Sequence, residues 1–202
     1  MDDIEITVID LPRDIRNFHL VAAFFEYRKK IFVDRMAWPL HNAEGIEFEQ
    51  YDSFSDTVYV VAHRRAEVIG GARLKRTDAI SCSGTVRYSY MIRDAHLGLL
   101  DGMPGELCHE APPVNEQCWE LTRLASEPVP GLSEHILEAA NDYLFKVGAK
   151  ECLFLGPPAF MRMATKLGWT PKALGEIVGN KDGRFLAFAC SVRSPAGRVL
   201  HA

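Results

Sequence analysis

The sequence predicts a single α/β (or α+β) domain with a mixed, twisted sheet and helices on both faces. Its length of 202 residues fits the upper end of one domain and supplies a large core. Its segments follow in the order strand, helix, hairpin, irregular segment, strand, helix, strand, helix, hairpin, which a mixed sheet accommodates. It contains no internal repeat or low-complexity segment. The domain is expected to span 1–193, with a flexible tail at 194–202.

Apolar runs that alternate, or that are rich in β-branched residues, mark the strands. They are expected at 4–9, 57–63, 68–75, 118–125, 151–156, 173–178 and 184–192. Only four residues separate the second run from the third, and this spacing predicts an antiparallel hairpin. The last two runs predict a closing hairpin of the same kind. Gly70 and Gly71, inside the third run, indicate a bulge or a close approach of another segment.

Alternation along a strand assigns its side chains to the two faces of the sheet. Arg73 and Lys75 share one face, where strand charges are ordinarily exposed, and Leu74 points to the other. On the strand 118–125 the same rule places Trp119, Leu121 and, by continuation, Arg123 on one face, and Glu120, Thr122 and Leu124 on the other.

Three segments carry apolar residues at helical spacing. The first, 13–35, holds several cations in its last turns, where they suit the helix dipole. The second, 133–147, and the third, 160–167, are each followed by a glycine, Gly148 and Gly168, which is the usual residue for ending a helix.

Composition narrows the classes of function. The net charge of -4 argues against a nucleic-acid partner. No apolar run reaches about eighteen residues, so no membrane span is expected. The acidic start runs directly into a strand, which argues against a secretory or transit peptide. The five cysteines are odd in number and lack C-x-x-C spacing, which favours reduced thiols in a cytoplasmic protein.

Several common catalytic motifs are missing from the sequence. It has no G-x-S-x-G elbow, no G-x-x-x-x-G-K-[ST] loop, no G-x-G-x-x-G fingerprint and no H-E-x-x-H helix. No Cys/His set has zinc spacing, so no metal site is expected. Hydrolase, nucleotidase, Rossmann dehydrogenase and zinc-enzyme chemistry are therefore disfavoured.

The segment after the first helix is the strongest candidate for a binding site. It holds Trp38 and an acidic cluster of Glu47, Glu49 and Asp52, shortly after Arg28. A cation, an aromatic wall and carboxylates so close together can hold a zwitterionic or cationic small molecule. The alternative is a surface loop with a buried tryptophan and solvated acids.

An ordered set of short motifs carries a resemblance. The motifs are R-x-x-x-F at 28–32, a tryptophan at 38, G-x-E-x-E-x-Y-D at 45–52, G-A-R-L at 71–74 and W-E-L-T-R at 119–123. This order resembles the acyl-homoserine-lactone synthases, the LuxI-type autoinducer synthases of bacterial quorum sensing. The resemblance implies a transferase with a fold like that of the GNAT acyltransferases. It implies S-adenosylmethionine as a substrate rather than a cofactor. It also implies an acyl thioester on acyl carrier protein or on CoA.

The resemblance also implies roles for individual residues. The implied catalytic residues are Glu120, the candidate general base, with Arg73 and Arg123 holding the substrate carboxylate or the acidic cluster. The implied S-adenosylmethionine side is formed by Arg28, Phe32, Trp38, Glu49, Asp52 and Thr122. Glu49 departs from the family, which usually has aspartate there. Backbone N–H groups of 120–124 are candidates for stabilising the oxyanion.

Two further sets of candidate residues, for the acyl pocket and for docking of a carrier protein, accompany the same resemblance. The acyl pocket is expected to include Phe154, Met161 and Trp169, whose bulk favours a short, branched or aryl acyl group. The charge is unevenly distributed, with 14 Lys and Arg against 24 Asp and Glu in 1–143, and 9 against 3 in 144–202. The basic C-terminal part suits an acidic carrier protein. Its candidate docking residues are Lys146, Lys150, Arg162 and Lys166.

Two other functions remain open on the sequence. One is a GNAT-type N-acyltransferase that uses acyl-CoA, although the segment 126–133 lacks the R-x-x-G-x-G/A loop of that class. The other is a non-catalytic small-molecule-binding domain of the same fold, against which the presence of Glu120 and both arginines argues.

Overall fold

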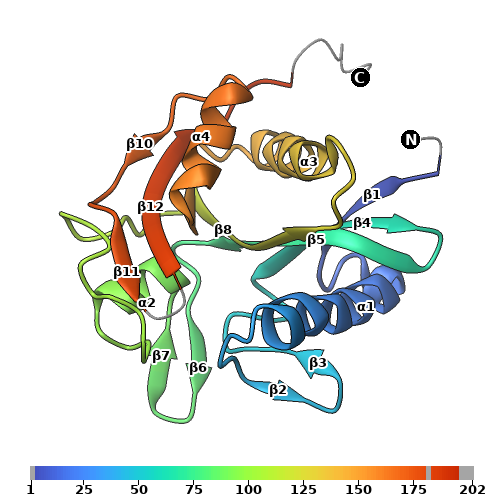
Figure 1. Ribbon diagram of the computed structural model, residues 1–202, viewed down its shortest axis with the longest axis horizontal. Helices are drawn as coiled ribbons and strands as arrows, with labels where there is room; N and C mark the ends of the chain where they lie inside the picture. The colour runs from blue at the N-terminus through green and yellow to red at the C-terminus, as the bar shows by residue number, and fades with distance from the viewer. Residues whose placement is uncertain (1–2, 181–182, 196–202) are drawn as a thin grey trace.

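An eight-stranded mixed sheet runs through the molecule (Figure 1). The computed structural model describes residues 3–180 and 183–195. The strand order is β1-β4-β5-β8-β9-β12-β10, and β11 pairs with β12 outside this path. The strands are β1 (Glu5–Asp10), β4 (Thr57–Arg64), β5 (Glu67–Arg76), β8 (Cys118–Ser126), β9 (Glu151–Gly156), β10 (Lys172–Ala173), β11 (Val178–Asn180) and β12 (Gly183–Ser191). Two small hairpins lie outside the sheet, β2 (Asn42–Ala43) with β3 (Ile46–Glu47) and β6 (Ser81–Ser83) with β7 (Val86–Tyr88).

Helices cover both faces of the sheet, as predicted. They are η1 (Ile15–Asn17), α1 (Phe18–Arg28), η2 (Lys29–Arg35), α2 (Met91–His96), α3 (Leu132–Lys146) and α4 (Pro158–Lys166). Figure 1 shows α1 on one side of the sheet and α3 with α4 on the other. The predicted helix 13–35 is confirmed. It begins with a 3-10 turn, continues as an α-helix and ends with the π-helical η2.

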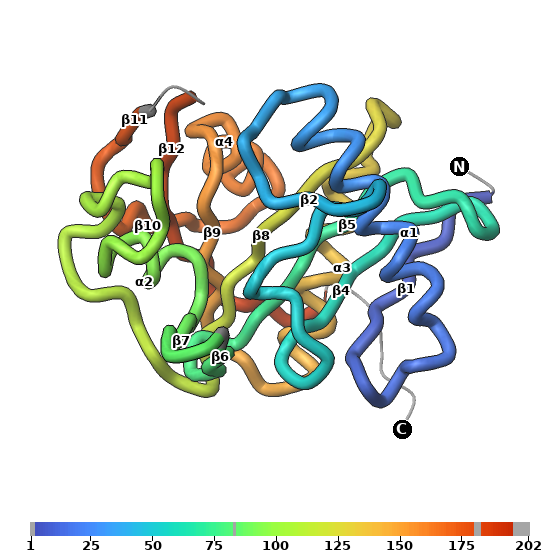
Figure 2. The backbone as a smooth tube through the Cα atoms, turned by 90° about the horizontal axis from the view of Figure 1, so that it is seen from below, coloured from blue at the N-terminus to red at the C-terminus, as the bar shows by residue number. Residues whose placement is uncertain are grey.

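Three apolar clusters follow from this layering. The largest lies between the sheet and the helices α3 and α4, the second lies under α1, and the third joins α2 to β9 and β12. Figure 2 shows the long connection 77–116 lying at the end of the molecule that holds β10, β11 and β12. The backbone N–H of His109, in this connection, donates to the carbonyl of Leu174 at 2.9 Å, which ties it to the C-terminal part.

The sheet changes from antiparallel to parallel pairing at β8. It pairs antiparallel with β5 along its length, but parallel with β9 only from Cys118 to Leu121. Beyond the pair Leu121 and Phe154, β8 continues to Ser126 without β9 beside it.

The prediction that Arg123 shares a face with Trp119 and Leu121 is wrong. The register shifts between β5 and β8, so that two residues of β8 stand against one residue of β5. Arg123 takes a φ of 55°, the left-handed conformation of a bulge residue. The bulge turns Arg123 to the face of Glu120, while Leu124 packs against the opposite core. The bulge indicated by the two glycines is confirmed, since the register shifts at Gly71.

The closing hairpin is confirmed in a modified form. The strand β12 pairs with β9 and also with two short strands, β10 and β11, where a single strand at 173–178 was predicted. Part of its turn, 181–182, and most of the predicted flexible tail, 196–202, lie outside the described residues. Among the helices that the structure describes, none combines the length and the hydropathy that a membrane crossing requires.

The α1 helix approaches the sheet most closely at Gly71. A Cβ atom there would lie 2.7 Å from Cε2 of Phe24 and 2.8 Å from the carbonyl oxygen of Val60. We therefore expect Gly71→Ala to lower the free energy of unfolding by about 1–3 kcal/mol, because the helix must shift outward. Urea denaturation checks this. Gly105→Ala is the matched control, because its Cβ would meet nothing closer than 3.7 Å. Equal stability of the two variants would contradict the close approach.

Candidate active site

The end of α1 delivers a fully buried arginine into the site. Arg28 is the last residue of α1, and its guanidinium lies 5.1 Å from the ring centroid of Phe25. The following π-helical turn carries Phe32, whose ring stacks on Trp38 with centroids 5.2 Å apart. The backbone N–H of Trp38 donates to the carbonyl of Phe32 at 2.9 Å, which fixes the loop against the helix. The predicted aromatic wall is therefore assembled beside the predicted cation.

Arg28 binds two carboxylates of the acidic cluster. Its Nη1 and Nη2 atoms donate to the two oxygens of Asp52 at 2.8 and 2.9 Å, and its Nε donates to Glu47. All three side chains are inaccessible to solvent. Burial alone would raise the pKa of Asp52, but Arg73 and Arg28 outweigh it and hold this pKa well below its usual range.

Glu49 joins the two other arginines. One of its oxygens accepts from Arg73 and the other from Arg123, both at 2.6 Å. Arg123 also donates to Glu47 at 3.2 Å, and Arg73 lies 3.2 Å from Asp52. The longer arm of glutamate at this position therefore still bridges both cations.

Three arginines and three carboxylates thus alternate in one buried network, which we call the ion network: Arg28, Arg73, Arg123, Glu47, Glu49 and Asp52. Its formal charges cancel. Thr122 and Tyr59 complete it, since Arg73 donates to Oγ1 of Thr122 at 3.0 Å and the Tyr59 hydroxyl donates to Asp52 at 3.0 Å. The sequence motif places Glu47 in the acidic cluster without indicating a role for it. In the structure Glu47 is wholly buried between two arginines.

Glu120 lies on the same face of β8 as Thr122, as predicted, and it is 1% exposed. Its two oxygens accept the backbone N–H groups of Met91 at 3.0 Å and Ile92 at 2.7 Å, the first two residues of α2. Burial raises the pKa of Glu120 to about 7, although the two N–H groups oppose this rise. A carboxyl group that titrates near neutrality is suited to proton transfer.

The contact between Glu120 and α2 was not predicted. Nothing in the sequence around 91–96 signals it, because it joins segments that are almost thirty residues apart. A further buried polar cluster was also missed. Its members are Tyr51, which donates to Asp94 at 2.8 Å, and Lys75, which donates to Ser81 at 3.1 Å.

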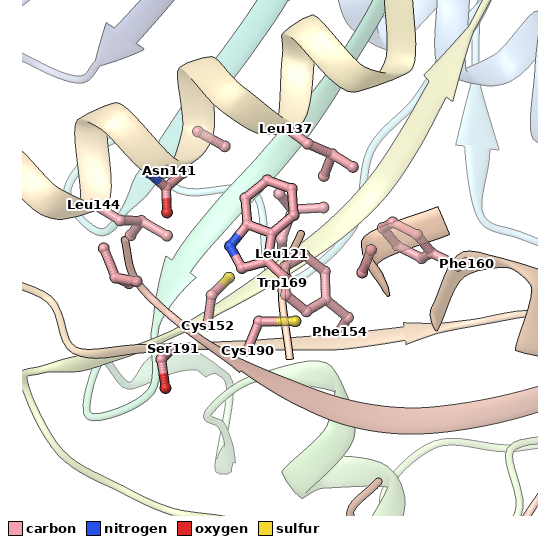
Figure 3. Close-up of a pocket in the computed structure, with 13 residues that line it drawn as sticks. Leu121, Leu137, Asn141, Leu144, Cys152, Phe154, Phe160, Trp169, Cys190 and Ser191 are labelled. Carbon is pink, nitrogen blue, oxygen red and sulfur yellow. The ribbon is translucent and has the colours of Figure 1, made fainter. Parts of the chain in front are cut away.

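A small apolar cavity lies on the other face of β8. Its volume is about 20 Å³, and it is lined by residues of β8, α3, β9, α4 and β12 together with Trp169. Figure 3 shows the Trp169 indole in the middle of this cavity, with Phe154 close by. Both were predicted for an acyl pocket. Met161 packs against the same core without lining the cavity.

The predicted docking residues are all exposed. Lys146 ends α3, Lys150 precedes β9, and Arg162 and Lys166 lie on α4. Across residues 3–180 and 183–195, no group of three or more His, Cys, Asp or Glu side chains is placed to hold a metal ion.

Comparison with known proteins identifies similar chains. Residues 14–111 match the family model described as autoinducer synthase. An acyl-homoserine-lactone synthase of Acinetobacter nosocomialis is 29% identical over 186 residues, covering 86% of this chain and 91% of that one.

Among solved structures, TofI in a ternary complex with an inhibitor and MTA has a TM-score of 0.74 at 23% identity, covering 95% of this chain and 93% of that one. The CoA-dependent acyl-homoserine lactone synthase BjaI, with SAM and isopentyl-CoA, has a TM-score of 0.76 at 19% identity, covering 94% and 84%. These two likenesses concern the fold, which extends to an acyl-CoA N-acyltransferase from Pseudomonas aeruginosa at a TM-score of 0.60 and 14% identity.

The ion network predicts acid lability. The pKa values of Glu49 and Asp52 are lowered in the folded chain, so the unfolded chain takes up protons first as the pH falls. We expect the free energy of unfolding to decrease steadily below about pH 5, the ordinary upper limit of carboxyl titration. Glu120, whose raised pKa acts in the opposite sense, titrates mostly above this range. Urea denaturation at pH values from about 6 to about 3, which bracket the ordinary carboxyl pKa values, measures the effect.

Glu49→Gln is the informative variant for this prediction. It carries no titrating group at this position, so its loss of stability between the same pH values should be smaller than that of the parent chain. An identical loss in both chains would show that Glu49 is not held ionised by the network.

Proposed function

We propose that this chain is an acyl-homoserine-lactone synthase, because residues 14–111 match the autoinducer synthase model and one such synthase is 29% identical over 186 residues. The proposed reaction has two steps. The amine nitrogen of S-adenosylmethionine attacks the carbonyl carbon of an acyl thioester, and the carbon–sulfur bond of the thioester breaks to release the thiol. The carboxylate oxygen of the acylated product then attacks its γ-carbon. The bond from this carbon to the sulfonium sulfur breaks, and methylthioadenosine leaves with the homoserine lactone closed.

The position and the raised pKa of Glu120 are the main support for the proposal. The attacking amine must lose a proton, and Glu120 is a buried carboxylate with a pKa of about 7 on the site face of β8. Each carboxylate oxygen has two acceptor positions, and the N–H groups of Met91 and Ile92 occupy one on each. The free positions can take the proton directly or through a water molecule.

The ion network is proposed to position the substrate and to take no part in bond making or breaking. Arg73 and Arg123 both bind Glu49 at 2.6 Å, which favours the acidic cluster over the substrate carboxylate as their partner. Its charges are mutually compensated, so it forms a fixed floor for the substrate. The stacked pair of Phe32 and Trp38 is proposed to wall the adenine or methionine side. The backbone N–H groups of β8 beyond Leu121, where β9 has separated, are proposed to stabilise the oxyanion.

The acyl group is proposed to enter the cavity beside Phe154 and Trp169. A cavity of about 20 Å³ has room for little more than a water-sized group, so an acyl group of any of these kinds requires the lining side chains to move. The donor is an acyl thioester, on acyl carrier protein or on CoA. The decisive assay supplies S-adenosylmethionine with straight, branched and aryl acyl groups on both carriers, and follows methylthioadenosine release and the product mass. A folded chain that releases no methylthioadenosine with any donor would overturn the proposal.

Removal of the base gives the first kinetic prediction. Glu120→Gln keeps the shape of the side chain but cannot accept the proton, so kcat/KM should fall by about 100-fold or more. In the parent chain kcat/KM should rise with pH through an apparent pKa of about 7, because only ionised Glu120 accepts a proton. The exposed Glu116→Gln is the matched control and should retain both rate and profile. A pH profile that Glu120→Gln leaves unchanged would assign the base elsewhere.

The basic surface gives the second kinetic prediction. Because acyl carrier proteins are acidic, the double reversal Lys150→Glu with Arg162→Glu should raise KM for a carrier-bound acyl group at least about tenfold at low salt. The KM for the same acyl group on CoA should change much less. Arg64→Glu, on an exposed residue of the β4–β5 hairpin, is the control for net charge. An unchanged KM for the carrier-bound donor would remove these residues from the docking surface.

A further inference from the structure

A buried lysine beside the proposed base lacks a charged partner. Lys75 lies on β5 and is 1% exposed. Its ammonium donates to the hydroxyl of Ser81 at 3.1 Å, and no ion pair joins it to a carboxylate anywhere in residues 3–180 and 183–195. Lysine is rarely buried so completely without an anion, because desolvation of an unpaired ammonium is costly. A buried ammonium group whose described hydrogen-bond partner is a neutral hydroxyl is a candidate for binding an anion.

The sheet register places this lysine directly beside Glu120. Lys75 in β5 and Glu120 in β8 are cross-strand partners. Arg73 and Thr122, two residues further along the two strands, are the next such pair on this face. Cross-strand partners have Cβ atoms about 4.5–5.5 Å apart, on the same face of the sheet. The base and the ammonium group can therefore reach two atoms of one small molecule.

Several carboxylates act on Lys75, but none of those described lies within ion-pair distance of its ammonium group. Burial lowers the pKa of Lys75. Asp56, Glu120 and Asp52 attract its charge and Arg73 repels it, and the buried Asp94 also interacts with it. The three arginines of the ion network differ from it, since each binds at least two carboxylates of that network directly. Among the four cations Arg28, Arg73, Lys75 and Arg123 on this face, Lys75 is the one that forms no ion pair with a carboxylate.

We propose that Lys75 binds the α-carboxylate of S-adenosylmethionine, an inference that rests on the proposed function. The amine and the carboxylate of this substrate are attached to the same carbon. Glu120 receives the amine, and the adjacent Lys75 receives the carboxylate. Lys75 then holds the oxygen that later attacks the γ-carbon. Lys75 does not line the acyl cavity, because the cavity lies on the opposite face of β8, on the side of Leu121 (Figure 3).

Ligand entry follows from the same contacts. Ser81 covers Lys75, and the N–H groups of Met91 and Ile92 cover Glu120. All three residues belong to the connection between β5 and β8. One outward displacement of this connection therefore frees the ammonium and the carboxylate together.

A comparison of two ligands tests the carboxylate contact. The ligands are S-adenosylmethionine and its decarboxylated form, which keeps the amine and the sulfonium. Calorimetry would compare the parent chain with Lys75→Met, which keeps an unbranched apolar stem. The variant should bind S-adenosylmethionine about tenfold or more weakly, because it loses a charge-assisted hydrogen bond, and should bind the decarboxylated form unchanged. Equal weakening for both ligands, or no weakening for either, would overturn the proposal.

Two further variants complete the design. Ser81→Ala removes the hydroxyl that binds Lys75 but keeps the ammonium, so its affinity for S-adenosylmethionine should be unchanged or higher. Lys75→Gln replaces Lys75→Met if that chain does not fold, and it should show the same selective loss. Failure of the proposed function has a different signature. A parent chain that binds neither ligand and releases no methylthioadenosine would sink the function, whereas a working enzyme with an indifferent Lys75 would sink only this inference.

Discussion

The buried ion network is the constraint on which the rest of the structure depends. Arg28 comes from α1, Glu47 and Glu49 from the loop around β3, and Arg73 and Arg123 from β5 and β8. Removing any member leaves an unpaired buried charge, which typically costs about 3–5 kcal/mol. Buried pairs of this kind add little net stability against a well-packed apolar alternative, so their effect here is positional. They fix one helix, one loop and two strands in a single relative arrangement.

Much of this arrangement can be predicted from local sequence, and the remainder cannot, for identifiable physical reasons. Alternation correctly puts Arg73 opposite Leu74, and motif order correctly groups Arg28 with the acidic cluster. Alternation fails at Arg123, because a bulge inserts one residue and reverses the faces beyond it. Lys75 was expected to be an exposed strand charge, and its burial depends on the connection 77–116 folding back over β5.

The two faces of β8 separate a polar side from an apolar side. Glu120 and Thr122 belong to the polar face, whereas Trp119 and Leu121 belong to the core that contains the small cavity. Successive residues of one strand therefore face the polar network and the apolar core alternately. A slip of one residue in the pairing with β5 would exchange these faces. The Arg123 bulge lies after Thr122, where it redirects one arginine without disturbing the alternation before it.

The short parallel contact between β8 and β9 has a mechanical consequence. The sheet consists of two plates, one built on β1, β4, β5 and β8 and the other on β9, β12 and β10, and the seam between them runs only from Cys118 to Leu121. The cavity takes its lining from both plates. The width of the cavity therefore depends on how rigidly four paired residues of β8 and the packed side chains hold the two halves of the sheet together. The two halves can tilt apart beyond Leu121 without losing a pair between β8 and β9.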